Sequence, residues 1–344
     1  MKKMIQGLEE YKDSLIDLIN NEFKYLTSLL AIAIVCFIPV NYYILVGGGI
    51  SDIGSRVKVE NSYKSKGSLN ISYVSETQGI FLTYVLSYIM PNWKRLEAED
   101  LKMNNKEGEK EVEFRNYLNL DESSSSALKV SYERAGKEVK LVKSHIYVIG
   151  ILESAEDCQL QVGDEILSMD GKEMEIVDYS KYISEKKVND MITIKVLRNK
   201  KEKEVKTKVY QGEDRPMIGI YMNVLNEYET VPKATIKFKK SESGPSGGLM
   251  TALSLYDQLV EEDITKGYKI AGTGTIDDEG YVGSIGEVKY KVIGAVAGKA
   301  DVFLVPAGEN YEDAKEVVEE QKLKIKLIPV KTFDQALKEL SKLK

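Results

Sequence analysis

The fold class is decided by the stretch ATIKFKKSESGPSGGLMTALSLYDQLVEE, residues 234–262. Its first residues, 234–239, are typical of a strand, because β-branched and aromatic side chains alternate there with polar ones. A glycine-rich turn follows, and from Gly247 to Glu262 the apolar side chains recur with the spacing of a helix. A strand joined to a helix by a short turn is the building unit of an α/β domain.

The C-terminal region continues this alternation of strands and helices. Apolar runs typical of buried strands are separated by segments with helical spacing. The predicted strands are residues 269–275, 302–305 and 324–328, and the predicted helices are 284–297, 311–320 and 332–343. We therefore expect residues 216–344 to form one α/β domain.

A second module, rich in β-strands, precedes this domain. Between residues 138 and 210, short apolar strands alternate with turns, and Asp170-Gly171 suits a tight hairpin. Leu160 to Lys172 reads LQVGDEILSMDGK, which resembles a segment of bacterial PDZ domains: Gly-Asp, an aliphatic strand and an Asn/Asp-Gly turn in succession. The resemblance covers residues 127–215 and implies a small β-rich PDZ-like domain.

The PDZ resemblance implies an extended peptide as ligand. Such a domain adds the peptide to its sheet as a strand and holds the C-terminal carboxylate in a loop of backbone N–H groups. Two hydrophobic-Gly-hydrophobic triplets are candidates for that loop, Ile149-Gly150-Ile151 and Ile218-Gly219-Ile220. The sequence does not choose between them, and either can equally be a strand with a glycine at a close approach.

An apolar segment near the N-terminus predicts a membrane anchor. Residues 25–46 carry no charge over 22 positions, and about 20 such residues span a bilayer as a helix. The segment lies too far from the start, and lacks the cleavage site, for a removable signal peptide. We expect one transmembrane helix that stays in place; the alternative is a buried helix of a soluble domain.

Charged residues around this helix bear on its orientation. Lysine and arginine are nearly balanced on its two sides, so the positive-inside rule does not decide. Lys24 abuts the apolar run, whereas the first positive residue beyond it, Arg56, is ten positions out, which favours a cytoplasmic tail at residues 1–24. Residues 47–126 are then membrane-proximal, and the sequence allows them to pack in part with the C-terminal α/β domain at 216–344.

The composition argues against several kinds of partner. The net charge is −6, and both signs are spread along the chain, so we expect no nucleic acid partner. The chain has two cysteines, Cys36 and Cys158, and one histidine, His145. This supply is too small for a zinc site and predicts no intrachain disulfide, and we expect neither a metal nor another cofactor.

The glycine turn presents Ser246 as a candidate nucleophile. Gly244 and Gly247 let the backbone bend tightly around Ser246, and the helix that follows offers free N–H groups near the hydroxyl. Such a turn suits a serine nucleophile with an oxyanion hole. A helix-capping serine in a glycine-rich turn is the common alternative.

A serine nucleophile needs a base, and histidine is an unpromising one in this chain. His145 lies in the β-rich module, and nothing in the sequence ties it to Ser246. Lysine is the natural substitute if burial lowers its pKa from about 10.4 to roughly 7 to 8. The largely apolar helix GSIGEVKYKVIGAVAG, residues 283–298, carries Lys289 and Lys291, which point to nearly opposite sides.

Several short motifs together resemble the proteolytic domain of Lon-type serine peptidases. In chain order they are Gly244-Pro245-Ser246-Gly247-Gly248, Gly272-Thr273-Gly274-Thr275-Ile276, Gly280-Tyr281-Val282 and Ile285-Gly286-Glu287-Val288-Lys289-Tyr290-Lys291. The resemblance implies that Ser246 is the nucleophile, Lys291 the base, and Thr273 the hydroxyl that orients the lysine. It gives Gly244, Pro245 and Gly247 supporting roles in the turn.

This sequence departs from the wider Lon pattern at two positions. Ser243 stands where an acidic residue is often found, with Glu242 beside it, and Glu287 replaces the second glycine of the Ile-Gly-Gly motif. Neither position is the nucleophile or the base. These departures bear on substrate positioning rather than on the chemistry.

The Lon enzymes of the cytosol also carry an ATPase, for which this chain shows no phosphate-binding loop. GAVAGKA, residues 294–300, has one residue too few between its glycines and ends in Ala instead of Ser or Thr. We therefore expect catalysis without ATP. The order of anchor, PDZ-like and Lon-like domains resembles the membrane-anchored PDZ-Lon proteases of Gram-positive bacteria.

This resemblance implies an outward-facing endopeptidase that cuts extended segments of secreted or membrane-associated proteins. We expect the strand at 234–239 to pair with the substrate backbone. The resemblance also admits a homo-oligomer, since Lon-like domains often form rings. One alternative is a non-catalytic membrane scaffold that binds peptide tails through the PDZ-like domain, and another is a soluble intracellular protease.

Overall fold

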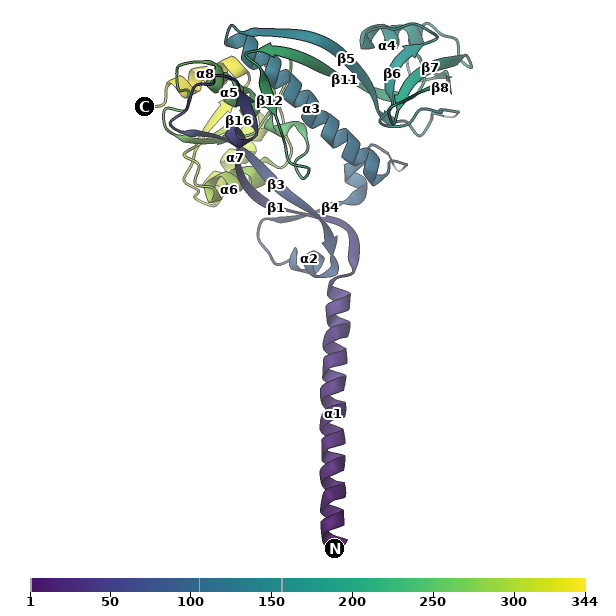
Figure 1. The fold of residues 1–344 in the computed structure, drawn as a ribbon, viewed down its shortest axis with the longest axis vertical. Coiled ribbons are helices and arrows are strands. Elements are labelled where there is room, and N and C mark those ends of the chain that lie inside the picture. The colour runs from purple at the N-terminus through teal and green to yellow at the C-terminus, as the bar shows by residue number, and fades with distance from the viewer. Residues whose placement is uncertain (1, 105, 156) are drawn as a thin grey trace. The chain divides into compact units, whose positions relative to one another are not determined.

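The chain forms two compact units in the computed structural model, which describes residues 2–104, 106–155 and 157–344 (Figure 1). The smaller unit holds the chain up to Val46 together with Glu76–Ala98, and the larger holds Gly47–Ser75 and Glu99–Lys344. Strands β1 (Pro39–Asp52) and β3 (Ser68–Ile80) each have residues in both units.

The smaller unit is built on one long helix. Helix α1 (Lys2–Cys36) leads into β1, whose residues Tyr42–Val46 pair antiparallel with β4 (Trp93–Glu97). The short helix α2 (Phe81–Leu86) contacts α1 and follows β3 directly (Figure 1). Ser14–Cys36 is long and apolar enough to cross a membrane, and the protein buries none of its most apolar stretch.

The end of this apolar helix differs from the prediction. The helix predicted at residues 25–46 ends at Cys36, and the last predicted residues belong to β1. Pro39 lacks an N–H group and cannot continue a helix, while the β-branched and aromatic residues after it favour a strand that β4 can pair with. The helix also begins well before residue 25, so the predicted tail is itself largely helical.

The helix in the uncharged segment of residues 79–90 is short. It is restricted to α2, since Gly79 and Ile80 still belong to β3. The Thr83 hydroxyl accepts a hydrogen bond from the backbone N–H of Ile80 at 3.0 Å and so satisfies one donor at the helix start.

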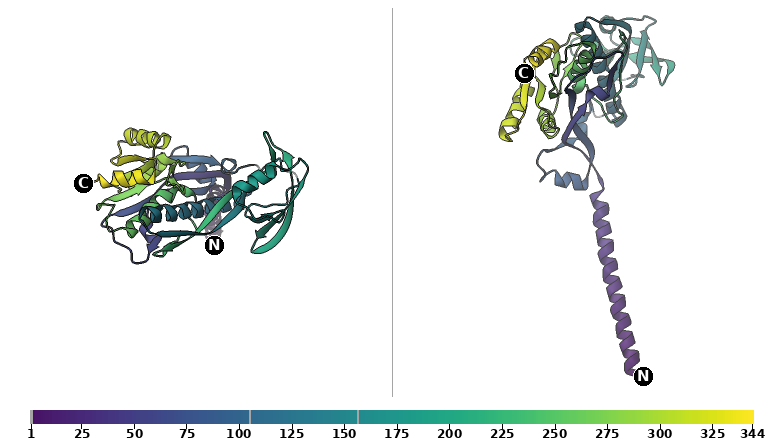
Figure 2. Two further views of the ribbon diagram at one scale, coloured as in Figure 1. Left: turned by 90° about the horizontal axis from the view of Figure 1, so that it is seen from above. Right: turned by 60° about the vertical axis from the view of Figure 1, so that its left-hand side comes forward.

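The larger unit contains the expected α/β domain. Its parallel strands run in the order β17-β16-β13-β3. The strands are β13 (Lys269–Gly272), β16 (Val302–Pro306) and β17 (Lys326–Val330), beside β3. The helices are α5 (Gly248–Leu259), α6 (Val288–Ala297), α7 (Glu309–Glu320) and α8 (Phe333–Ser341), coloured green to yellow in Figure 2. Each predicted element is present, with ends shifted by a few residues.

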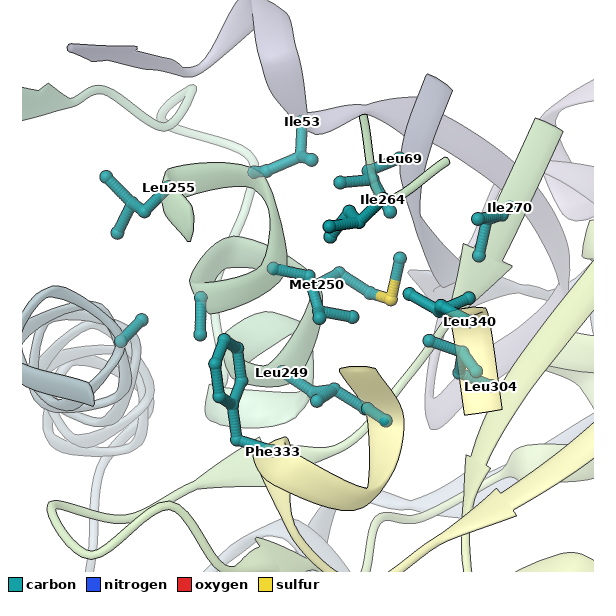
Figure 3. Close-up of a cluster of buried hydrophobic side chains, with 14 of the residues drawn as sticks. Ile53, Leu69, Leu249, Met250, Leu255, Ile264, Ile270, Leu304, Phe333 and Leu340 are labelled. Atoms are coloured by element: carbon teal, nitrogen blue, oxygen red, sulfur yellow. The ribbon is translucent and has the colours of Figure 1, made fainter. Parts of the chain in front are cut away.

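Helices cover both faces of this parallel sheet. Along β16, Val302 and Leu304 point into a core formed with α5 and α8, while Phe303 and Val305 point into a second core with α6 and α7. Figure 3 shows part of the first core, where Leu249 and Met250 of α5 lie near Phe333 and Leu304. A parallel sheet buried on both faces requires such apolar strands.

Helix α3 (Glu109–Arg134) is one continuous helix of 26 residues. Four consecutive serines, Ser123–Ser126, lie inside this helix, although serine is a residue that often caps a helix start. Several of their hydroxyls bond to segments outside the helix, including Ser123 to the carbonyl of Pro245 at 2.9 Å. Tertiary partners therefore occupy serine hydroxyls that could otherwise compete for backbone groups of the helix. Gly136, with φ of +64°, follows the helix end, where glycine is common.

The β-rich module is a five-stranded antiparallel sheet with the order β11-β5-β6-β7-β8. Its strands are β5 (Glu138–Ile151), β6 (Glu165–Met169), β7 (Met191–Arg198), β8 (Lys201–Lys208) and β11 (Ile220–Val231). Helix α4 (Ile176–Ser184) closes a separate apolar core that includes Val148, Met169 and Ile194. Asp170 and Gly171 both have positive φ, as a tight turn of the expected kind requires.

Short elements complete the larger unit. They are the single turns η1 (Ile53–Ser55), η2 (Ala98–Leu101, starting at the unit boundary) and η3 (Pro245–Gly247), and the strands β2 (Val57–Val59), β9 (Tyr210–Gln211), β10 (Pro216–Met217), β12 (Ala234–Ile236), β14 (Thr275–Ile276) and β15 (Val282–Gly283). Strand β12 covers half of the strand predicted at 234–239 and pairs antiparallel with β2.

Candidate active site

Ser246 lies in a tight turn that leads into helix α5. Gly244 has φ of +83°, a conformation that favours glycine, and Pro245 to Gly247 form the single turn η3. The turn also lies close to its neighbours, since a Cβ atom on Gly247 would come within 2.8 Å of Ile71 Cδ1. Ser246 is partly exposed at the start of α5, where backbone N–H groups and the helix dipole favour negative charge.

Thr273 connects this turn to Lys291. The Lys291 ammonium donates to Thr273 Oγ1 at 3.3 Å, and Thr273 Oγ1 donates to the backbone carbonyl of Ser246 at 3.1 Å. The N–H of Gly274 donates to the same carbonyl at 2.8 Å. Thr273 directly follows β13, so the three predicted site segments meet at the carboxyl end of a parallel strand.

Lys291 is held in an environment that disfavours its charge. Its side chain is buried in α6, with 5% of the residue exposed. Burial lowers its pKa from 10.5 to about 8, and the carboxylate of Glu287 opposes this by raising the pKa. Lys289, two positions earlier, is exposed and pairs with Glu316, so the two lysines face opposite environments as the sequence predicted.

Glu287 occupies an unusual backbone position directly before α6. Its φ of +62° and ψ of 33° lie in the left-handed region, which costs roughly 1 to 2 kcal/mol for a residue with a side chain. Glycine at this position, as in the wider Lon pattern, would avoid that cost. This chain instead carries a carboxylate there, one helical turn before the buried Lys291.

We predict that Glu287→Gln moves the pH dependence of catalysis to lower pH. Lysine can accept a proton only in its neutral form, so an activity that uses Lys291 as its base should rise with pH through the Lys291 pKa of about 8. Removing the carboxylate removes the interaction that raises this pKa, while glutamine keeps the backbone cost. The measurement is kcat/KM of a reporter peptide between about pH 6 and pH 10. Glu316→Gln is the control, and an unmoved midpoint in the Glu287 variant would contradict the prediction.

A cavity of about 590 Å³ lies beside Pro245, in the turn that carries Ser246. It is lined by α3, β11, Pro245 and the segment that joins β14 to β15. Its wall includes the carboxylates of Glu122, Asp277, Asp278 and Glu279. The cavity therefore places carboxylates and hydrogen-bonding side chains next to Pro245, the residue before Ser246.

Two of these carboxylates are firmly positioned. Asp278 accepts hydrogen bonds from Ser126, Asn226 and Tyr228 at 2.6, 3.2 and 3.1 Å. Glu122 accepts one from the Asn223 amide at 2.5 Å. Burial raises the pKa of the Glu122 carboxyl; the Asn223 hydrogen bond opposes this, and the nearby charge of Asp278 adds to it.

The sequence did not single out the contribution of α3 to this site. Ser123 holds the carbonyl of Pro245, Ser126 holds Asp278, and Glu122 lies in the cavity wall. One signal in the sequence could have indicated this packed, polar helix surface. It is the run of four consecutive serines inside a helix that also has an apolar face. Ser72 of β3, which donates to the backbone carbonyl of Lys291 at 2.5 Å, was likewise missed.

Glu242 and His145 each contact partners other than Ser246. Glu242 accepts from the Arg56 guanidinium at 2.6 Å and from the N–H of Lys239, so it fixes the approach to the turn. His145 Nδ1 lies 2.7 Å from Glu165 Oε1 in the β-rich module, where its ring stacks on Tyr147. These contacts give both residues structural partners.

The two triplets of the β-rich module have different structures. Ile149-Gly150-Ile151 forms the end of β5, where Gly150 and Ile151 pair with Tyr221 and Ile220. Ile218 and Gly219 precede β11, and Gly219 has φ of +69°. Strand β11 lies at the edge of the sheet, and α4 contacts both β10 and β11.

Within the described ranges, no group of three or more His, Cys, Asp or Glu side chains is arranged to hold a metal ion. Cys36 and Cys158 are both free thiols.

Comparison with known proteins assigns families to both modules. Residues 230–342 match the family model of the Lon protease C-terminal proteolytic domain, and residues 134–209 match the PDZ domain. A Lon protease of Trichlorobacter lovleyi is 32% identical over 97 residues, which are 28% of this chain and 12% of that protein. A Lon protease of Aster yellows witches'-broom phytoplasma is 33% identical over 116 residues, or 33% of this chain and 14% of that protein.

Among solved structures, the PDZ domain of the SdrC-like protein from Listeria monocytogenes is 27% identical and covers 24% of this chain and 92% of that one, with a TM-score of 0.22. The chain spans only a small part of the length of the curated Lon relatives. The two family matches agree with the architecture and with the order of the two modules. The protein therefore combines a PDZ domain with a Lon-type C-terminal proteolytic domain behind one apolar N-terminal helix.

Proposed function

We propose that this protein is a membrane-anchored serine endopeptidase that uses Ser246 and Lys291 and needs no ATP. The observation that carries the proposal is the buried Lys291, linked through Thr273 to the backbone of Ser246. Burying a lysine costs folding stability, and a catalytic role would explain why the chain keeps a lysine at this position. A lysine with a pKa near 8 is instead well suited to act as a general base.

The proposed reaction is acyl transfer to the serine hydroxyl. Neutral Lys291 accepts the proton of Ser246, whose Oγ attacks the carbonyl carbon of the scissile peptide bond. N–H groups at the start of η3 and α5 stabilise the negative oxygen that develops. Lys291 then gives its proton to the leaving amine, and a water molecule, deprotonated by the same lysine, releases the acyl group.

Thr273 is proposed to be a positioning residue in this reaction. Its hydroxyl accepts from the lysine and donates to the Ser246 carbonyl, so one side chain orients both partners. It is fully buried, which keeps its rotamer defined. Gly244, Pro245 and Gly247 support the site by holding the turn in the conformation that presents the hydroxyl.

Substrates are proposed to bind as extended segments. Strand β12 lies shortly before the nucleophile turn and pairs with β2 in a two-stranded sheet, which leaves its other edge available to a substrate strand. The PDZ domain is proposed to hold a peptide along the edge strand β11, facing α4. The positive φ of Gly219 favours Ile218-Gly219-Ile220 as the carboxylate loop, while Ile149-Gly150-Ile151 serves as strand.

The acidic cavity suggests a preference for basic side chains next to the scissile bond. Burial and Asp278 both disfavour the charge on Glu122, and a substrate lysine or arginine would relieve this cost. We predict that Glu122→Gln lowers kcat/KM for such a substrate by about tenfold or more. A matched peptide with norleucine at the same position is the control. An equal loss on both peptides would contradict a charge-specific role.

The apolar stretch Ser14–Cys36 is proposed to be the anchor, with the N-terminus in the cytoplasm and both domains outside. Secreted and membrane-associated proteins are then the accessible substrates. An assembly of several copies around the proteolytic domain is part of the same proposal, as Lon-type domains often form rings.

The proposal is tested with the full-length protein reconstituted in lipid nanodiscs. We expect hydrolysis of an unstructured fluorogenic peptide without nucleotide, and acylation of Ser246 by a serine-directed reagent, detected by mass spectrometry. Peptide binding without turnover or acylation would favour the scaffold alternative instead.

A further inference from the structure

The smaller unit exposes an apolar surface that the rest of the unit does not cover. The α2 patch consists of Phe81, Leu82, Val85, Tyr88, Ile89 and Met90. Each of these side chains is exposed, and Ile89 is 75% exposed. Six large apolar side chains close together in sequence are more than a soluble surface normally leaves in water.

The sequence around the patch contains no charge. From Thr77 to Trp93 the chain has no Asp, Glu, Lys or Arg. Helix α2 itself is only six residues long, so the segment cannot span a bilayer as a helix. A short uncharged segment of this kind can lie in the interface between lipid headgroups and acyl chains.

The α2 patch is continuous with the apolar surface of α1. The N–H of Phe81 donates to the carbonyl of Ile38 at 2.8 Å, which places the start of α2 directly at the end of the apolar helix. Phe37 and Ile38 are themselves exposed there. Ser14–Cys36 has 23 residues, and at about 1.5 Å per residue it is long enough to cross a hydrocarbon core of about 30 Å.

Aromatic and basic side chains border the patch in the manner of a membrane interface. Tyr84 lies 5.0 Å from Tyr42 and 5.6 Å from Tyr88, measured between ring centroids. The Arg95 guanidinium carbon lies 3.8 Å from the centroid of the Tyr88 ring, and its NH1 donates to Ser87 Oγ at 3.0 Å. Tyrosine and tryptophan are enriched at the headgroup level, where basic side chains also reach the phosphates.

We propose that the α2 patch inserts into the leaflet at the C-terminal end of α1, as a second membrane contact of this chain. The occupant of the surface is lipid, because the patch extends the face of a helix that is itself proposed to lie in acyl chains. The inference rests on the proposed anchor. Its consequence is that the smaller unit is held to the bilayer at two places and cannot pivot freely about α1.

The test uses depth-dependent fluorescence quenching in the full-length protein. Both native cysteines are removed by Cys36→Ala and Cys158→Ala, and a single environment-sensitive dye is attached after Ile89→Cys. Matched variants carry the dye after Leu30→Cys in α1, or after Glu213→Cys in an exposed turn of the PDZ domain. Each protein is reconstituted in phosphatidylcholine and phosphatidylglycerol vesicles with or without lipids that bear a nitroxide on the acyl chain.

We expect the dyes at positions 30 and 89 to show blue-shifted emission and to lose intensity with nitroxide lipids, and the dye at position 213 to show neither change. Quenching at position 30 but not at 89 would overturn the second contact and leave the anchor standing. No quenching at either position would overturn both proposals. Quenching at 213 equal to that at 89 would show a non-specific effect and would also overturn the inference.

Discussion

Ser246→Ala is expected to lower kcat for peptide hydrolysis by about 10⁴-fold or more. The alanine variant has no oxygen that can form the acyl intermediate, while the turn, the lysine and the proposed oxyanion donors all stay in place. Hydrogen bonds to the backbone carbonyl of residue 246 do not use the hydroxyl, so the fold should be unaffected. The measurement is turnover of a fluorogenic peptide, with thermal unfolding to verify the fold.

Ser243→Ala is the matched control for the nucleophile. Ser243 is an exposed serine in the same loop, three positions before Ser246. Its replacement should leave kcat within a few fold of the wild type. Full activity of the Ser246 variant would remove the basis of the proposed mechanism, and peptide binding by that inactive variant would separate recognition from chemistry.

Lys291→Met is expected to abolish hydrolysis to a similar degree without harming the fold. Methionine fills nearly the same buried space but cannot accept a proton. The residual activity of the double variant Ser246→Ala/Lys291→Met should be no lower than that of either single variant, because the two residues act as a unit. Lys289→Met, at the exposed position of the same helix, should retain activity.

Lys291→Met is also expected to change the stability of the protein. Burial lowers the pKa of Lys291 from 10.5 to about 8. Keeping this lysine charged in the folded protein therefore costs about 3 kcal/mol of stability. This cost is fully present below pH 8 and is relieved as pH rises from 8 to 10.5, where the unfolded chain binds more protons than the folded one. Lys291→Met removes it, so the variant should be as stable as the wild type or more stable at pH 7, measured by denaturant unfolding. A clear loss of stability would mean that the amine holds the site together.

Chain order and local pattern were enough to predict the two domains. Strands and helices of the proteolytic domain repeat the motif around residues 234–262, and their apolar spacing is a local property of the chain. The motif around Asp170-Gly171 likewise depends on positive φ angles that few residues adopt. The family matches at residues 134–209 and 230–342 agree with these predictions.

Long-range contacts explain where the sequence-based elements were wrong. The apolar run beyond Pro39 has the composition of a membrane helix, but its pairing with β4 makes it a strand. The serines of α3 have the composition of a helix cap, but distant carbonyl and carboxylate partners keep them inside the helix. Composition cannot distinguish these cases because the deciding partner is remote in sequence.

Local patterns in the chain were enough to indicate the residue types of the candidate site: a glycine-flanked Ser246, a Thr273 after a strand, and Lys291 on an apolar helix face. These follow from periodicity and from the motifs that local backbone geometry requires. Packing of remote segments, in contrast, buries Lys291 and joins it through Thr273 to the turn of Ser246. Packing also brings carboxylates from α3 and the β14–β15 segment to a cavity beside Pro245. Burial and electrostatic environment are properties of packing between remote segments, and for that reason the pKa of the lysine could be anticipated in direction but not established from the chain alone.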